Sequence, residues 1–432
     1  MRWRNWAGNV RFEPARVEYP TSEAELGSLL RTARRAGSPV RVVGNSHSFS
    51  RLIETTGTLV SLEKMQGLIE LDPSTGDATL WGGTLLRTLG ALLHDKGVGL
   101  ETMGDVDAQT IAGAIGTGTH GTGGAFGIMA TLVQGLTLVL ANGEVVECSD
   151  EKNPEVFRAA RLSLGALGVI TRVRLRTVPS FRLAFIQRKT SLRDCLDGVD
   201  AHVRDHRHFE FYYFPWTDTV QCKFLDVTEE AAEESSIGTY LNDVVLENGA
   251  LKIVSEVSRL VPGTTASVSK FCAWAVPKEL RKTGWSHRIF TTPRLVRFYE
   301  MEYAIPRESL ADCLLEIADS VRRENHRVHF PIECRFVKED DICLSPAYGR
   351  PSAYLAVHMY EGMDHRRYFD AVEAIFRKFR GRPHWGKMHT LTSAALADLY
   401  PQWQGFHEVR RELDPEGLFA TPYTRSLFED RA

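Results

Sequence analysis

The stretch from Gly104 to Gly127 constrains the fold more than any other part of the chain, because it places eight glycines in 24 positions. Part of it, Gly116-Thr-Gly118-Thr-His-Gly121, matches the GxGxxG pattern of Rossmann dinucleotide sites. Such a site needs a strand before the glycines and a helix that begins at the last one. Gly121 is instead followed by Thr-Gly-Gly-Ala-Phe-Gly, which has low helix propensity. We therefore expect these glycines to serve another purpose.

Two interpretations of the glycines stand side by side. Backbone without side chains can approach a pyrophosphate and direct successive N–H groups at it, with threonine hydroxyls as further donors. Tight turns and close packing alone also require glycine. A second loop of small polar residues, Gly44 to Ser48, favours the first interpretation. This loop follows a short apolar strand at 40–43 and a helix that begins with the capping-box pattern Ser22-x-x-Glu25.

The composition argues against several classes of function. A formal net charge of −3 over 432 residues speaks against a nucleic-acid or membrane-surface partner. No apolar run is long enough for a membrane span or a secretory signal. The seven cysteines are scattered without a CxxC pair, and no histidine cluster has zinc-like spacing. We therefore expect a cytoplasmic protein with reduced thiols and no metal site, and the composition says nothing of the oligomeric state.

The second half of the chain has a different pattern, and we place a boundary near residue 180. Beyond Pro179 glycines become rare and aromatic strands appear, as in His208 to Pro215. Strands and helices then follow in an order that predicts an antiparallel sheet covered by helices, an α+β arrangement. The expected strands are 296–305, 328–336 and 354–360, and the expected helices are 309–323 and 368–379.

Several motifs resemble the FAD domain of the vanillyl-alcohol-oxidase superfamily. They are Val-Gly-Asn-Ser-His-Ser at 43–48, the run 104–123, and Ser-Leu-Gly-Ala-Leu-Gly-Val-Ile at 163–170. Near the end, Gly-Arg-Pro-His-Trp-Gly-Lys at 381–387 and Asp-Pro-Glu-Gly-Leu-Phe at 414–419 resemble the sugar-lactone and alditol oxidase branch.

This resemblance covers nearly the whole chain and implies a two-domain α+β fold of the vanillyl-alcohol-oxidase type. An FAD-binding domain of the PCMH type is expected at 1–180, and a substrate or cap domain at 181–432. The segment from about 390 to 432 is expected to return to the FAD domain.

The resemblance also implies a set of FAD-binding residues. In this branch the histidine of the G-x-x-H-S loop commonly carries the flavin, which implies a covalent bond between His47 and the flavin 8α-methyl group. FAD held without a covalent bond is the alternative. The residues expected to line the cofactor are Gly44, Asn45, Ser46, Ser48, Gly104, Asp105, Thr110, Gly113, Thr117, Gly118, His120, Gly121, Ile170 and Lys387.

The substrate is expected to lie against the second half. Glu333 and Arg335 alternate on one predicted strand and so point to one face, and His358 and Tyr360 repeat that spacing on the next predicted strand. A Glu-x-Arg pair by itself is usually a surface ion pair. In the family pattern these residues line the substrate pocket, together with Lys387 after the His-Trp-Gly turn.

These residues suggest how a hydroxyl group would be oxidised. Lys387 and Arg335 are expected to bind the hydroxyl and lower its pKa, while Glu333 orients them. His358 is expected to accept the proton, with the identity of the base left open, and hydride passes to flavin N5.

The resulting hypothesis is FAD-dependent oxidation of a sugar lactone such as L-gulono-1,4-lactone, with O2 reduced to H2O2. Gly104 favours O2, because in the family a small residue there leaves room for oxygen. An alditol oxidase acting on xylitol or sorbitol, a lactone dehydrogenase with another acceptor, and a flavin carrier without turnover are the alternatives. Asp105 weakens the alditol alternative, since alditol oxidases tend to carry serine there, and the polar pocket residues speak against a carrier.

Overall fold

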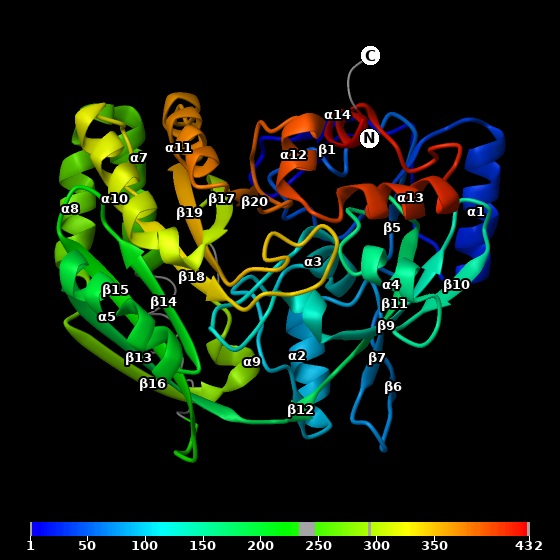
Figure 1. The fold of residues 1–432 in the computed structure, drawn as a ribbon, viewed down its shortest axis with the longest axis horizontal. Helices are drawn as coiled ribbons and strands as arrows, with labels where there is room; N and C mark the ends of the chain where they lie inside the picture. Colours follow the sequence, from blue (N-terminus) through cyan, green and yellow to red (C-terminus); the bar gives the residue numbers. More distant parts are fainter. Residues whose placement is uncertain (1, 233–246, 293–294, 430–432) are drawn as a thin grey trace.

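The structure is a computed structural model that describes residues 2–232, 247–292 and 295–429. Figure 1 shows two halves side by side. The blue to teal N-terminal part forms one half, and the green to orange middle of the chain forms the other. The last, red part lies on the N-terminal half. The fold is the expected α+β type.

Two main sheets form the N-terminal half. Within residues 2–232, a parallel sheet has the order β3-β5-β4 and an antiparallel sheet has the order β10-β9-β11-β7-β6. The strand predicted at 40–43 is β4, and the turn Asn142-Gly143 joins β9 to β10. The strands are β1 (Trp3–Arg4), β2 (Arg11–Phe12), β3 (Arg16–Glu18), β4 (Val40–Val43), β5 (Thr58–Ser61), β6 (Leu68–Leu71), β7 (Ala78–Trp81), β8 (Val98–Gly99), β9 (Val133–Val139), β10 (Val145–Cys148), β11 (Val169–Leu175) and β12 (Val178–Pro179).

Helix α1 (Glu23–Arg35) begins at the predicted cap. The Ser22 hydroxyl accepts a hydrogen bond from the Glu25 backbone N–H at 3.2 Å. The Glu25 carboxylate binds the backbone and hydroxyl of Thr21 instead of completing the capping box with Ser22. The other helices of this half are α2 (Leu86–Asp95), α3 (Ile111–Thr117), the 3-10 helix η1 (Met129–Leu132) and α4 (Pro154–Ala160).

The glycine-rich segment contains a helix that its composition did not predict. Helix α3 begins where the Thr110 hydroxyl accepts from the Gly113 backbone N–H, and it ends at Gly118, whose φ of 79° favours glycine. The GxGxxG glycines therefore lie at the end of a helix. In a Rossmann site a helix would begin at the last glycine, so this placement agrees with the expectation that the chain has no such site here. Buried Ile111 and Ile115 compensate for the low propensity of the glycines, because they anchor the helix in the core.

One antiparallel sheet forms the other half. Over the described parts of 182–383, eight strands pair in the order β16-β13-β15-β14-β18-β19-β17-β20. The strands are β13 (Arg182–Ser191), β14 (His208–Tyr213), β15 (Thr219–Thr228), β16 (Glu279–Trp285), β17 (Phe298–Pro306), β18 (Ile332–Val337), β19 (Ser352–Tyr360) and β20 (Arg382–Pro383).

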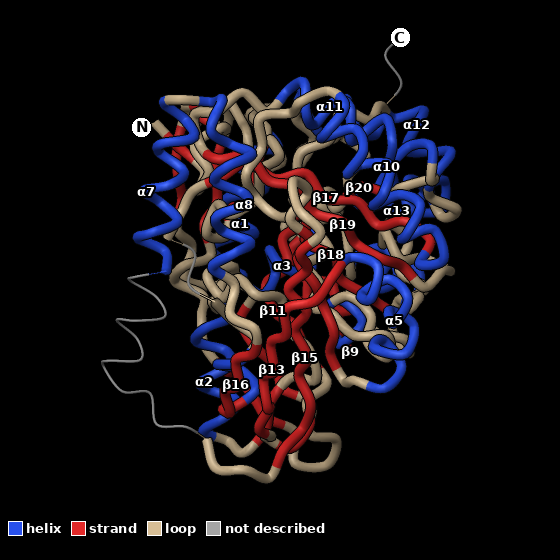
Figure 2. The backbone as a smooth tube through the Cα atoms, turned by 90° about the vertical axis from the view of Figure 1, so that its left-hand side faces the viewer, coloured by secondary structure: helices blue, strands red, loops and turns tan. Residues whose placement is uncertain are grey.

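Helices lie outside the strands of this half, as Figure 2 shows. Helix α5 packs on β13, β14 and β15, and α11 packs on β17 and on α10. Among the described residues, no helix is both long and apolar enough to cross a bilayer. The helices are α5 (Leu192–Asp205), α7 (Glu247–Leu260), η3 (Pro262–Thr264), α8 (Thr265–Ala275), α9 (Ser286–Ile289), η4 (Arg307–Ser309), α10 (Leu310–Arg323) and α11 (Arg366–Lys378).

The C-terminal segment packs against the N-terminal half. It contains α12 (Ser393–Leu399), α13 (Trp403–Leu413) and α14 (Pro422–Phe428), and α13 contacts α4. The Val40 backbone N–H donates to the Leu418 carbonyl at 2.9 Å. The buried Arg41 guanidinium donates to the carbonyls of Leu52, Leu164, Gly165 and Phe419 and so joins four chain segments. The domain bounds at residue 180 and at about 390 stay predictions.

Candidate active site

A cavity of about 280 Å³ lies between the two glycine-rich loops of the N-terminal half. A Cβ atom on Gly44 would lie 2.3 Å from the Thr110 hydroxyl, so glycine is required where the loops meet. A Cβ position on Gly116 has no atom within 4 Å, so this backbone faces open space. The predicted cofactor residues that line this cavity are Gly44, Asn45, Ser46, His47, Ser48, Thr110, Gly113, Thr117 and Ile170. Bare backbone and hydroxyl groups in this arrangement fit a pyrophosphate.

A smaller cavity of about 70 Å³ continues from the first one toward the large sheet. The two cavities share four lining residues, which are His47, Ser48, Gln109 and Thr117. The far wall of the smaller cavity is ionic. Its charged and imidazole side chains are Asp105, His120, Glu300, Glu302, Arg335, His384 and Lys387.

The remaining predicted cofactor residues lie around the smaller cavity or behind its lining. Asp105, His120 and Lys387 line it. Gly104 and Gly121 support the lining through close backbone contacts: a Cβ on Gly104 would lie 2.7 Å from Thr119 Cγ2, and one on Gly121 would lie 2.4 Å from the Met103 carbonyl oxygen. Gly118 faces the side chain of Leu162 and not the cavity, and its role is to end α3.

Three residues of the ionic wall, Glu300, Glu302 and Arg335, come from one face of the large sheet. Side chains at every second position of a strand share a face, and neighbouring strands align them. Glu210 lies opposite Arg335 on β14 and β18, and Glu300 lies opposite His358 on β17 and β19. The prediction that Glu333 and Arg335 share a face is confirmed by their ion pair of 2.5 Å.

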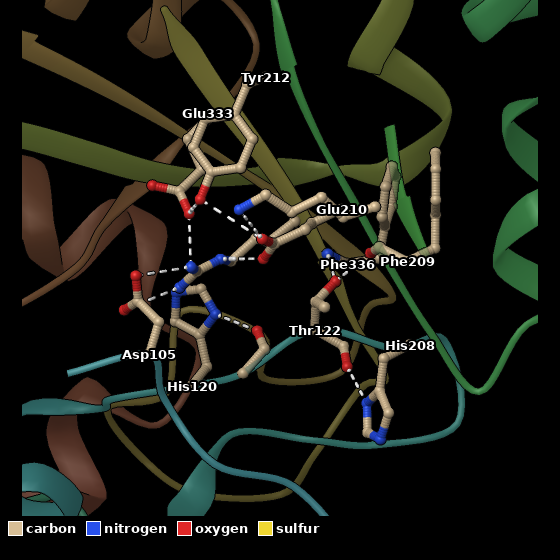
Figure 3. A network of polar contacts seen from close by, with 12 residues as sticks. Asp105, His120, Thr122, His208, Phe209, Glu210, Tyr212, Glu333 and Phe336 are labelled. Carbon is tan, nitrogen blue, oxygen red and sulfur yellow. Dashed lines mark hydrogen bonds and ion pairs between the residues drawn. The ribbon is translucent and has the colours of Figure 1, made fainter. Parts of the chain in front are cut away.

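Arg335 is the centre of an ion-pair network, and Figure 3 labels its partners Asp105, Glu210 and Glu333. Its guanidinium lies 2.5 Å from Glu333, 2.9 Å from Glu210 and 3.0 Å from Asp105. The Tyr212 hydroxyl donates to Glu333 at 2.6 Å. Burial by itself lowers the pKa of Arg335, but the three carboxylates outweigh burial and hold that pKa well above its ordinary value. Arg335 is therefore a fixed cation.

Lys387 is the second cation of the wall. Its Nζ lies 2.5 Å from Glu300 and 3.8 Å from Glu302. Burial lowers the pKa of Lys387, yet the two carboxylates reverse this effect and raise it. Burial likewise raises the pKa of Glu300, but Lys387 and then His358 bring it down to about 2. Both partners are thus ionised at neutral pH.

His120 connects the glycine-rich segment to the large sheet. Its Nδ1 lies 2.8 Å from the Gly121 carbonyl oxygen, and its Nε2 lies 3.1 Å from a Glu302 oxygen. Glu302 in turn lies 3.8 Å from Lys387, so His120 belongs to the same polar network as this cation.

Two buried groups of three side chains have metal-ligand atoms within 4.8 Å of one another, among the described residues. They are His120, Glu302 and His384, and Glu300, Glu333 and His358. The glutamates of both groups already pair with Lys387 or Arg335. The arrangement is that of an ion-pair wall, and it does not change the prediction of no metal.

Three predicted substrate residues do not line the smaller cavity. His358 Nε2 lies 3.5 Å from Glu300 and 3.8 Å from Glu333, so it lies behind these carboxylates. Glu333 reaches the cavity only through Arg335. The Tyr360 hydroxyl donates to Glu256 of α7 at 2.5 Å, away from the ionic wall.

Sequence reasoning missed Glu210, Tyr212, Glu300 and Glu302. The signal was present, because Glu210 and Tyr212 alternate within an aromatic strand and Glu300 and Glu302 alternate within 298–306. This is the spacing that identified Glu333 and Arg335. A polar pair on one face of an otherwise buried strand needs partners, and the neighbouring strands supply them.

Comparison with known proteins identifies the family. A model of the D-arabinono-1,4-lactone oxidase family matches residues 173–427, and a model of the FAD binding domain matches residues 14–149. The chain belongs to the D-arabinono-1,4-lactone oxidase family. The N-terminal cavity is therefore part of an FAD-binding domain, and the ionic wall combines Asp105 and His120 of that domain with residues of the lactone oxidase part of the chain.

Relatives resemble this family member over almost its full length. L-gulono-1,4-lactone dehydrogenase of Mycobacterium tuberculosis is 40% identical over 425 residues, which are 98% of this chain and 98% of the relative. L-gulonolactone oxidase of Mus musculus is 35% identical, over 99% of this chain and 98% of the relative.

A solved structure confirms the predicted fold. A solvent-stable cholesterol oxidase aligns with a TM-score of 0.84 over 99% of this chain and 97% of its own, at 19% identity. At that identity the likeness concerns the fold alone, which is the two-domain vanillyl-alcohol-oxidase type.

Proposed function

We propose that the protein oxidises a hydroxyl group of a sugar lactone such as L-gulono-1,4-lactone, with FAD as the cofactor. The observation that carries this proposal is the wall formed by the buried Arg335 and the partly buried Lys387, two cations that line the smaller cavity next to the FAD-domain cavity. The names of the relatives from Mycobacterium tuberculosis and Mus musculus support the substrate class.

The side chains of the wall account for the proton chemistry. Bound FAD supplies the hydride acceptor. Lys387 stabilises the negative charge that develops on the substrate oxygen, and Arg335 aligns neighbouring oxygens with its fixed fork. Glu300 lies between Lys387 and His358, at 2.5 and 3.5 Å. The hydroxyl proton leaves along this row of side chains, with His358 as its proposed acceptor.

Gly104 supports O2 as the electron acceptor, with H2O2 as product. Gly104 packs directly against Thr119, which lines the smaller cavity, and a Cβ there would lie 2.7 Å from Thr119 Cγ2 and so push on this lining. Relatives carry both oxidase and dehydrogenase names, so the acceptor is a property of the individual chain.

His47 is the proposed point of covalent flavin attachment. It lies in both cavities and stacks on Trp6 with ring centroids 5.7 Å apart. Burial lowers the pKa of His47 to about 4, and the charges of Arg87 and Lys387 act in the same direction. The ring is therefore neutral at pH 7, as a nitrogen that bonds to carbon must be. A cytoplasmic location is proposed as well, in keeping with seven free cysteines.

A substrate panel tests the proposed function. Purified protein is mixed without oxygen with L-gulono-1,4-lactone, other aldonolactones, xylitol and sorbitol, and flavin absorbance is followed; peroxide release is measured in air. We expect at least one lactone to bleach the flavin faster than either alditol. Bleaching by alditols alone would assign the protein as an alditol oxidase. A flavin that dithionite reduces but no substrate bleaches would indicate a carrier.

A further inference from the structure

A third cavity, which we call the side chamber, adjoins the smaller cavity and, in the described part of the chain, shares no lining residue with the FAD-domain cavity. Its volume is about 320 Å³, against about 70 Å³ for the smaller cavity. Asp105 and Arg335 line both, so their 3.0 Å ion pair forms part of a common wall. Neither the relatives' names nor the chemistry of hydroxyl oxidation assigns a role to this space.

One wall of the side chamber is the continuation of the polar sheet face. Tyr212 lies opposite Gln221, and Glu210 lies opposite Lys223, on the paired strands β14 and β15. Lys223 Nζ is 3.1 Å from Glu210 and 4.2 Å from the centre of the Tyr212 ring. The remaining walls are mainly apolar, with Phe290 among their side chains.

The charges of the side chamber favour a neutral ligand. Among the described residues that line it, two cations, Lys223 and Arg335, balance two carboxylates, Asp105 and Glu210. Burial raises the pKa of Glu210, but Arg335 and Lys223 lower it overall, so the carboxylate stays charged. An anionic ligand would meet two carboxylates, whereas hydroxyl groups can donate to them and accept from Lys223 and from Gln221. Polar groups on one wall and apolar side chains on the others suit a carbohydrate chain.

The cavity sizes indicate which part of the substrate lies there. A carbon that reacts beside Lys387 lies in the smaller cavity, which is narrow. FAD bound in the neighbouring FAD-domain cavity would close one side of it. The side chamber is the larger space next to this cavity, at Asp105 and Arg335, and offers room for the rest of a six-carbon lactone.

We propose that the side chamber binds the exocyclic hydroxylated chain of the lactone, with Lys223 and Gln221 as residues that determine specificity for chain length. The inference rests on the proposed function, because it concerns the non-reacting end of the same substrate. Lys223 and Gln221 act on binding of this chain, and the reacting carbon stays beside Lys387.

Three 1,4-lactones with the same ring configuration test this proposal. One carries a two-carbon glycol chain, as L-gulono-1,4-lactone does, one carries a single hydroxymethyl group, and one has no chain. They are oxidised by the wild type and by the variants Lys223→Met and Gln221→Leu, which remove polar groups at similar volume. Arg188→Met is the matched control, because Arg188 lies on the same sheet but lies opposite Cys222, on the face away from the chamber.

We expect Lys223→Met to lower kcat/KM for the glycol lactone by roughly tenfold or more, mainly through KM, because a hydrogen bond from a charged group is lost. The chainless lactone should change by less than about twofold, and Gln221→Leu should show the same order with a smaller loss. Arg188→Met should leave all three unchanged. Thermal melting of each variant checks that the fold is intact.

Equal losses for all three lactones would overturn the proposal, because they would show that Lys223 acts through Arg335 on the reacting end. Unchanged kinetics in both variants would overturn it as well. A wild-type flavin that no lactone bleaches would refute the proposed function itself, a result separate from the chain-length comparison.

Discussion

Lys387→Met should slow flavin reduction strongly while leaving the flavin bound. The substitution keeps most of the side-chain length but removes the cation that lies 2.5 Å from Glu300 and 3.8 Å from Glu302. The residues that line both the FAD-domain cavity and the smaller cavity do not include Lys387, so the flavin content should stay near that of the wild type.

The magnitude follows from the pKa of Glu300. That pKa lies at about 2 instead of 4.5 although burial raises it, and Lys387 is the largest opposing cause. The interval corresponds to a net stabilisation of the charged carboxylate by about 3 kcal/mol, after the opposing effect of burial. A substrate alkoxide beside the same ammonium group should gain a similar amount. Loss of one such preorganised donor typically costs about 10²–10³ in rate, which agrees with this value.

Anaerobic stopped-flow reduction by the best lactone measures the effect, and Glu300→Gln serves as the companion variant. With Glu300 neutral, burial is less well opposed and the pKa of Lys387 should fall. The cation is then lost as pH rises through the lowered pKa, so the reduction rate should decline at a lower pH than in the wild type. A Lys387→Met variant that reduces its flavin at nearly the normal rate would show that the ionic wall is not the reaction site.

Four further predictions follow from the same structure. Acid-precipitated wild type should stay yellow and carry the mass of one FAD, while His47→Ala should release its flavin; colourless wild-type pellets would exclude the covalent bond. Gly104→Ala brings a Cβ within 2.7 Å of Thr119 Cγ2, which must then shift at the lining of the smaller cavity, and should slow reoxidation by O2 with little change in lactone reduction; unchanged peroxide formation would refute the role of this glycine. Arg41→Met leaves buried carbonyls of Leu164 and Phe419 without their donor and should lower the free energy of unfolding by about 3 kcal/mol or more, seen as a lower Tm. Burial lowers the pKa values of His208 and His329 to about 4, so below pH 6.5 the unfolded chain binds more protons than the folded chain. The free energy of unfolding should therefore fall between pH 6.5 and pH 4, by at most about 3 kcal/mol for each histidine. A flat stability profile in acid unfolding would contradict this.

Local chemistry predicted much of the fold. Apolar spacing located the helices found at α10 and α11 and the strands found at β18 and β19, each within a few residues. The two glycine-rich loops identified the cofactor cavity, because backbone that approaches a pyrophosphate closely needs residues without side chains. Helix α3 was missed, since its stability comes from Ile111 and Ile115 in the core rather than from local propensity.

The sequence by itself determined that Glu333 and Arg335 share a face, because alternation along a strand is a local property of the backbone. Which side chains stand next to them was decided by the order β14-β18-β19-β17 and by its register, which depend on contacts between distant segments. That order placed Glu300 between Lys387 and His358 and left Tyr360 with Glu256. Buried charges need partners within a few ångströms, and only the tertiary structure brings those partners together.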